Sequence, residues 1–74
     1  GEYFDDSVIT TKVKTAFLQE PTLKSTEISV ETFKGVVQLS GFVSSEADID
    51  KATEVARSVE GVKSVKNALQ VKGR

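Results

Sequence analysis

The chain has 74 residues and a net charge of −1, with 10 basic and 11 acidic side chains and no cysteine or histidine. This length is typical of one small domain, which buries only about 60% of its unfolded surface and therefore needs a good core. The balanced charge argues against a nucleic-acid partner, because a nucleic-acid binder carries a basic excess that neutralises phosphates. Without cysteine there is no disulfide or thiolate chemistry, which is compatible with an oxidising compartment. We expect no signal peptide in this chain and no membrane span, because no run of about 18 apolar residues occurs.

A first helix is predicted from about Ser7 to Glu20. Asp5, Asp6 and Ser7 offer side-chain oxygens and negative charge at its start. Pro21 ends it, because the residue before a proline avoids the α conformation. The apolar stripe at helical spacing consists of Ile9, Val13, Ala16 and Phe17.

Two strands follow, Glu27–Phe33 and Val36–Val43, joined by a two-residue Lys-Gly loop that suits a tight hairpin turn. Pairing the strands directly across this loop puts the apolar side chains of both on one face, so this register is self-consistent. The predicted pairs are Phe33 with Val36, Thr32 with Val37, Val30 with Leu39, and Ile28 with Gly41.

The second strand contains two unusual neighbours, Gly41 and Phe42. Gly41 leaves the covered face without a side chain, and we expect it to let a helix approach the sheet closely. The alternative is a bulge that bends the strand. Phe42 points to the opposite face, where water is expected.

A second helix is predicted from about Glu46 to Val59, with its apolar stripe at Ile49, Ala52, Val55, Ala56 and Val59. The stretch 45–48, Ser-Glu-Ala-Asp, fits a capping box, and Gly61 is expected to cap the other end in the left-handed conformation. A last strand, Ser64–Val71, places Asn67 on its inward face. We expect Asn67 near an end of the sheet, bonded to loop backbone, because an unpaired amide there costs about 1 to 3 kcal/mol.

These elements predict an α+β fold in the order αββαβ, a three-stranded mixed sheet with two helices packed on one face. A right-handed crossover places the last strand parallel to the second strand, which is then central. The less favoured arrangement puts the last strand beside the first.

Three motifs of this chain together resemble the BON domain family. They are Asp6-Ser7 at the start of the first helix, Leu39-Ser40-Gly41-Phe42-Val43 in the hairpin, and Val59–Asn67 after the second helix. The resemblance covers roughly Phe4 to Val71 and predicts a single BON-like domain over residues 1–74, with its core at about 5–71. It implies a periplasmic or secreted, lipoprotein-like envelope module linked to osmotic stress, which contacts phospholipid or holds a membrane-associated complex together. In some members of the family the lipid contact lies on a helix.

Enzymatic chemistry is not expected. The chain has no histidine that could act as the base for a serine nucleophile, and Ser44 and Ser45 are read as helix-capping residues. The carboxylate pairs Asp5-Asp6 and Asp48-x-Asp50 are first-turn charges, and the second lacks the glycine and distal glutamate of a calcium loop. No metal site or cofactor is therefore predicted, although potassium on backbone carbonyls would leave no sequence pattern. The αββ order at the start of the chain also resembles that of RNA-binding KH domains. Their GXXG loop, which clamps the nucleic-acid backbone, is absent from this sequence.

The first helix offers a surface for an anionic phospholipid or membrane, because lysines attract anionic headgroups and apolar side chains enter the bilayer. The candidate residues are Val8, Lys12, Lys14 and Leu18. The alternative is structural: Leu18 packs under the turn at 21–23, and Val8 staples the start of the helix.

The outer sheet face offers a second surface, an apolar cluster of Phe33, Val36 and Phe42, which Ala68 extends. Its partner would be another BON domain or an envelope protein, and its alternative role is cross-strand packing within the hairpin. The basic tail is a third candidate surface, and it consists of Lys63, Lys66, Lys72 and Arg74. Its alternative reading is solvated edge protection, which the outward strand positions of Lys66 and Lys72 explain. The sequence thus favours a non-enzymatic periplasmic module that contacts phospholipid, with a protein-interaction or chaperone-like module as the alternative.

Overall fold

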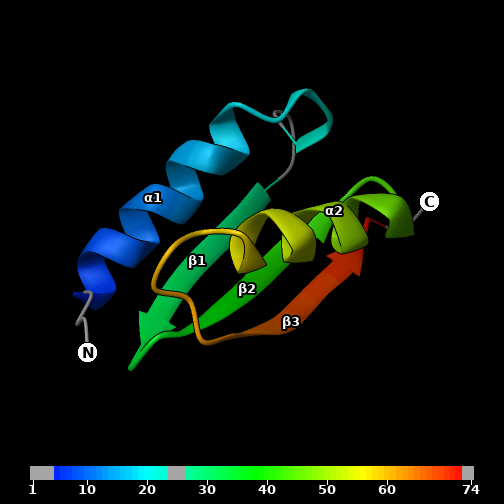
Figure 1. The fold of residues 1–74 in the computed structure, drawn as a ribbon. Helices are drawn as coiled ribbons and strands as arrows, with labels where there is room; N and C mark the ends of the chain where they lie inside the picture. Colours follow the sequence, from blue (N-terminus) through cyan, green and yellow to red (C-terminus); the bar gives the residue numbers. More distant parts are fainter. Residues whose placement is uncertain (1–4, 24–26, 73–74) are drawn as a thin grey trace.

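The computed structural model describes residues 5–23 and 27–72, so Arg74 lies outside the described residues. The elements in chain order are α1 (Asp6–Leu18), the 3-10 helix η1 (Pro21–Leu23), β1 (Glu27–Phe33), β2 (Val36–Val43), α2 (Glu46–Arg57) and β3 (Ser64–Val71). Figure 1 shows the sheet with β2 between β1 and β3 and with α1 and α2 on the same face. The predicted α+β fold and its αββαβ order are confirmed.

The sheet has the predicted pairing. β1 and β2 are antiparallel, with Phe33 opposite Val36 and Ile28 opposite Gly41. β3 runs parallel to β2, because α2 carries the chain back across the sheet between these strands. The turn residues Lys34 and Gly35 have φ angles of 51° and 84°, the left-handed values that a tight two-residue hairpin turn requires.

The core lies between the sheet and the two helices, and it forms a single cluster. β2 contributes most from the sheet, since it is covered along its length and paired on both sides. α2 meets the sheet through Ala52 and Ala56, both fully buried, and these small side chains bring its backbone close to the strands. The other buried members are Ile9, Val13, Phe17, Leu23, Val30, Val37, Leu39, Val43 and Leu69.

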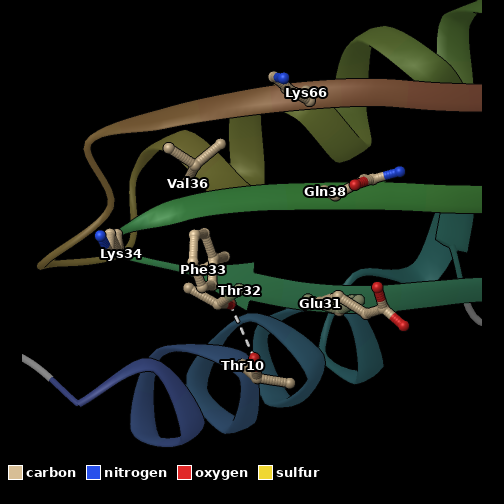
Figure 2. Close-up of a pocket in the computed structure, with 9 residues that line it drawn as sticks. Thr10, Glu31, Thr32, Phe33, Lys34, Val36, Gln38 and Lys66 are labelled. Atoms are coloured by element: carbon tan, nitrogen blue, oxygen red, sulfur yellow. Dashed lines mark hydrogen bonds between the residues drawn. The ribbon is translucent and has the colours of Figure 1, made fainter.

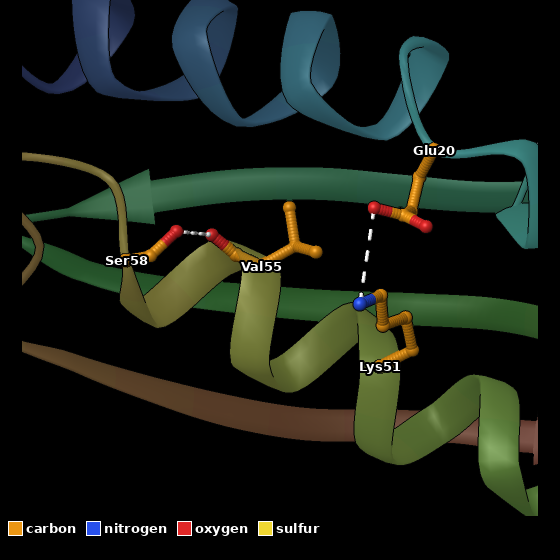
Figure 3. Close-up of polar contacts among 4 residues, drawn as sticks. All are labelled: Glu20, Lys51, Val55 and Ser58. Carbon is orange, nitrogen blue, oxygen red and sulfur yellow. Dashed lines mark hydrogen bonds and ion pairs between the residues drawn. The ribbon is translucent and has the colours of Figure 1, made fainter.

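Both helices end earlier than predicted. α1 stops at Leu18, and the proline that was expected to end it instead begins η1. α2 stops at Arg57, and Ser58 follows as its C-cap residue. The Ser58 N–H makes the last helical bond, to the Glu54 carbonyl at 3.1 Å, and its Oγ donates to the otherwise open Val55 carbonyl at 2.7 Å (Figure 3). Gly61 therefore does not cap the helix and lies instead in the turn that follows, with φ at 97°.

The capping box predicted at the start of α2 is not formed. Ser45 has the extended backbone of an N-cap residue, but its side chain makes no capping hydrogen bond. The N–H of Asp48 instead bonds the backbone carbonyl of Ser45 at 3.1 Å. The helix therefore begins where the sequence predicted, with its first turn closed by backbone rather than by side chains.

Gly41 is required by a neighbouring strand and not by a helix, which differs from the prediction. Its φ is 124°, and a Cβ atom placed there would lie 1.9 Å from the carbonyl oxygen of Glu27 on β1. The register continues unbroken from Ile28–Gly41 to Glu27–Phe42, so the pairing shows no bulge at this point. The missing side chain lets the backbones of β1 and β2 come together.

Candidate functional site

The outward side of α1 carries all four residues predicted to contact lipid. Val8 is 45% exposed and Leu18 is 70% exposed, while Lys12 and Lys14 are also exposed. Val8 and Lys12 are neighbours at four-residue spacing, as are Lys14 and Leu18, on the side of the helix away from its buried stripe. The two pairs lie on opposite flanks of the exposed side of α1, because Lys12 and Lys14 are two residues apart and therefore about 160° apart around the helix. We call this exposed side, with both pairs, the α1 outer surface.

The exposure of Leu18 and Val8 contradicts the structural roles that the sequence offered for them as alternatives. Leu18 does not pack beneath the turn at 21–23, since most of its side chain is exposed to solvent. Val8 is too exposed to act as a buried staple. Neither residue belongs to the core cluster or to the apolar residues packed against it. Both side chains are therefore open to contact from outside the domain.

The acidic residues at the two ends of α1 have partners within the protein. Asp5 caps the helix, accepting hydrogen bonds from the N–H and the Oγ of Ser7 at 2.9 and 2.7 Å. These bonds hold the pKa of the Asp5 carboxyl below its ordinary value. At the other end, Glu20 lies 3.9 Å from the ammonium of Lys51 on α2, an exposed and therefore weak ion pair (Figure 3).

Asp6 connects α1 to the sheet through hydrogen bonds, a role that the sequence did not predict. Its carboxylate accepts hydrogen bonds from the backbone N–H groups of Lys34 and Gly35, at 2.7 and 3.0 Å. Both N–H groups belong to the tight turn between β1 and β2, 28 and 29 residues further along the chain. We call this contact the Asp6 clamp. It fixes which side of α1 faces outward.

Two further contacts hold the same region. Thr10 on α1 donates a hydrogen bond from its hydroxyl to that of Thr32 on β1, at 2.7 Å (Figure 2). From the other side, the N–H of Lys63 bonds the Gly35 carbonyl at 2.8 Å, and the stem of the lysine lies against Gly35. The hairpin turn is thus bonded on one side to α1 and on the other to the segment that precedes β3.

The basic residues predicted as one solvated tail are in different places. Lys63 adjoins the hairpin turn, and Lys66 lies on the outer sheet face (Figure 2). Lys72 follows the opposite end of β3, where its N–H bonds the Val43 carbonyl at 2.7 Å. They therefore do not act as a single basic patch.

The outer sheet face carries its aromatic residues at its two ends. Phe33 is 71% exposed and lies beside Val36, while Phe42 is 45% exposed and lies beside Glu27. Val36 and Phe42 are six residues apart on β2, a separation of roughly 20 Å along a strand. The structure therefore brings Phe33 and Val36 together but does not bring Phe42 to them, and the contiguous apolar cluster predicted from the sequence is wrong.

An open depression of about 750 Å³ lies at the hairpin end of this face (Figure 2). Phe33 and Val36 form its apolar part, and the Lys34 ammonium lies 5.5 Å from the centre of the Phe33 ring. Its remaining lining comprises Thr10, Val30, Glu31, Thr32, Gln38 and Lys66. The depression is polar along one side and aromatic at one end.

Asn67 has a structural environment that differs from the predicted one. Its Nδ2 donates to the Thr53 hydroxyl on α2 at 2.8 Å, and its Oδ1 accepts from the N–H of Leu69 at 2.9 Å. Asn67 pairs with Leu39 in the middle of β3 and is exposed, rather than bonding loop backbone at an end of the sheet. Its two hydrogen bonds connect the edge strand β3 to α2 and satisfy the N–H of Leu69 on β3.

The described residues contain no group of three or more side chains suited to hold a metal ion. Within residues 5–23 and 27–72, no side-chain nitrogen or oxygen is buried without a hydrogen-bond partner. Neither α1 nor α2 is long and apolar enough to pass through a bilayer.

Comparison with known proteins identifies the family. The BON domain matches residues 5–73. Osmotically-inducible protein Y of Escherichia coli K12 is 51% identical over 72 residues, which are 97% of this chain and 36% of that protein. A 21 kDa hemolysin of Actinobacillus pleuropneumoniae is 45% identical over 65 residues, 88% of this chain and 33% of the relative.

A third relative, an uncharacterized protein of Anaplasma centrale, is 30% identical over 67 residues, which cover 90% of this chain and 44% of that protein. The chain thus spans a third to less than half of the length of these curated relatives. The resemblance drawn from the sequence motifs is confirmed by the match over residues 5–73, and the chain belongs to the BON domain family.

Proposed function

We propose that this chain is a non-enzymatic module of the bacterial cell envelope that binds anionic phospholipid through the α1 outer surface. The name of osmotically-inducible protein Y, together with the BON domain, supports a role in osmotic stress and a periplasmic location. Fractionation of cells that express the full-length protein tests the location. Recovery of the protein in the cytoplasm alone would contradict it.

The observation that carries the proposal is the exposure of Leu18. The Leu18 side chain is 70% exposed at the end of the helix, so it contributes little to the stability of the fold. Its transfer from water into the apolar layer of a membrane is favourable. Lys14 lies one turn before it on the same side and reaches the headgroup level.

The charges around the helix set the strength of this binding. The carboxylates of Asp5, Asp6 and Glu20 bond the protein itself but keep their negative charge, so they work against the attraction between the lysines and an anionic surface. Each lysine near such a surface contributes about 1 kcal/mol at physiological salt. Two lysines and two apolar side chains therefore give weak, reversible and salt-sensitive binding.

Vesicle co-sedimentation tests this function. Wild-type protein should bind vesicles of phosphatidylglycerol and phosphatidylcholine more than vesicles of phosphatidylcholine alone, and added salt should weaken the binding. Leu18→Ser and Lys14→Glu should each lower it, while the stability changes by no more than about 0.5 kcal/mol because both residues are exposed.

The matched control is Lys72→Glu, which changes the net charge equally but lies at the end of β3. It should leave most of the vesicle binding intact. Equal losses for Lys14→Glu and Lys72→Glu would show that only net charge matters. No binding at low salt to any anionic vesicle would overturn the proposal.

A further inference from the structure

We propose that the outer sheet face is self-complementary and pairs with the same face of a second copy of this chain, forming a two-sheet sandwich. This surface is separate from the α1 outer surface and lies on the side of the sheet that the helices leave uncovered (Figures 1 and 2). The inference does not depend on lipid binding.

The register of the sheet arranges the outer side chains in rows across the strands. The rows, from β1 through β2 to β3, are Phe33–Val36–Ser64, Glu31–Gln38–Lys66, Ser29–Ser40–Ala68 and Glu27–Phe42–Gln70. The second row places a carboxylate on one edge strand and an ammonium on the other. These two groups are two strand spacings apart, about 10 Å, and within the described residues neither forms an ion pair.

A two-fold axis that runs along β2, between two stacked sheets, converts this row into complementary contacts. Such an axis lays the β1 of one copy over the β3 of the other, at the same height along the strands. Glu31 then faces the Lys66 of the second copy, and Lys66 faces its Glu31. One row of a single sheet thus supplies two intermolecular ion pairs.

The other rows fit the same axis. The large ring of Phe33 faces the small Ser64, and Val36 and Phe42 each face their own counterpart. Glu27 faces the neutral Gln70, so no like charges meet. The ring of Phe33, which is 71% exposed in the single chain, gains a covering layer, and the depression beside it is filled.

The opposite arrangement, with the two sheets antiparallel, is less complementary. It places β1 over β1 and β3 over β3, so Glu31 and Lys66 receive no opposite charge. When centred on the face, it also sets Glu27 against the ring of Phe33. The charge pattern therefore selects the first arrangement.

The spacing between layers suits the side chains that must meet. Stacked sheets lie about 10 Å apart, a gap that a glutamate and a lysine extending toward each other span. Aligned sheets cross at about −30°, and the Glu31–Lys66 row is close enough to the axis to stay in register.

The size of the face predicts a weak dimer. Eight residues of β2 and three strands cover roughly 25 by 14 Å, which buries on the order of 800 Å² in total. Stable interfaces bury about 1,200 Å² or more, so we expect association only at high protein concentration.

Charge reversal tests the inference, with association measured by sedimentation velocity over a wide concentration series. Glu31→Lys and Lys66→Glu should each weaken the dimer roughly tenfold or more, because each sets like charges against each other at two places. The double reversal, Glu31→Lys with Lys66→Glu, should restore it. An equimolar mixture of the two single variants should also associate, since every facing pair is then oppositely charged.

The controls reverse charges elsewhere on the surface. Glu54→Lys and Arg57→Glu, both on α2, match the two changes in net charge, and neither should alter self-association. Their mixture should associate no more than either variant alone. Circular dichroism of each variant establishes that it is folded before its association is compared.

Three results would overturn the proposal. They are a wild-type chain that stays monomeric at the highest concentration, single reversals that associate like the wild type, and a double reversal or mixture that fails to recover the dimer. Vesicle binding by a monomeric wild type would leave the proposed lipid function standing without the dimer.

Discussion

The two faces of the sheet are built from the same strands but differ in what their side chains contact. On the covered face, Val37, Leu39 and Val43 of β2 are at most 2% exposed, and Gly41 stands where no side chain fits. On the outer face, the intervening residues of β2 include Val36, Gln38 and Phe42, which are exposed or half-buried. The side chains of the covered face are buried in the core, whereas those of the outer face are available for contact with a partner.

This difference separates stability from binding within one strand. A change on the covered face removes packing or introduces a clash, so it alters the free energy of unfolding. A change on the outer face alters which partners the domain can bind. Neighbouring residues of β2 therefore give matched tests of the two roles.

Gly41→Ala should have the largest effect. The added Cβ would collide with the Glu27 carbonyl, and the φ of 124° is one that alanine rarely adopts. We expect a loss of roughly 2–4 kcal/mol in the free energy of unfolding, measured with urea. Ser40→Ala, one residue earlier, is the control and should change it far less. A loss of under about 1 kcal/mol for Gly41→Ala would mean that the strands separate easily at this point.

Much of this architecture follows from local patterns. The alternation of apolar residues and the two-residue turn predict the bounds of all three strands and the register between β1 and β2. Even the separation of Phe33 from Phe42 is contained in that register, since Phe42 must lie opposite Glu27. The predicted cluster was wrong because residues of one face were grouped without their positions along the strands.

Other features depend on contacts that no local pattern reveals. Asp6 resembles an ordinary first-turn acid, and its partners in the turn become neighbours only after the fold has formed. Asn67 likewise finds Thr53 only when α2 is packed on the sheet. Gly41 was correctly predicted to be special, but the neighbour that requires it is a strand backbone and not a helix.

Asp6→Ala should have the next largest effect. It removes both acceptors of the clamp and leaves the N–H groups of Lys34 and Gly35 without a protein partner. Because the clamp is partly exposed, water replaces some of what is lost, and we expect a cost of about 1–2 kcal/mol in thermal or urea unfolding. Asp6→Asn keeps one acceptor oxygen and should retain part of the stability. Equal stability for Asp6→Ala and the wild type would show that the clamp does not hold α1 to the sheet.

Phe42→Ser should have the smallest effect on stability. The ring is partly exposed on the outer face, and its loss should cost no more than about 1 kcal/mol, chiefly through lower strand propensity. It should also weaken the proposed dimer, because the ring meets its own counterpart there.

Val43→Ser, at the next residue, is the matched control on the covered face. Val43 is 2% exposed, so the change should cost several times more stability, on the order of 3 kcal/mol. A Phe42→Ser protein that unfolds as readily as Val43→Ser would show that the outer face also belongs to the core.

The most direct test of the central claim, that α1 binds lipid while the sheet supports it, is an NMR titration at low protein concentration. Nanodiscs of phosphatidylglycerol are added to isotope-labelled protein, and the amide signals are followed residue by residue. We predict shifts and broadening at Val8, Lys14 and Leu18, with Gln38 and Phe42 on the outer sheet face unchanged. Perturbation centred on Gln38 and Phe42, with the α1 signals unaltered, would contradict the account.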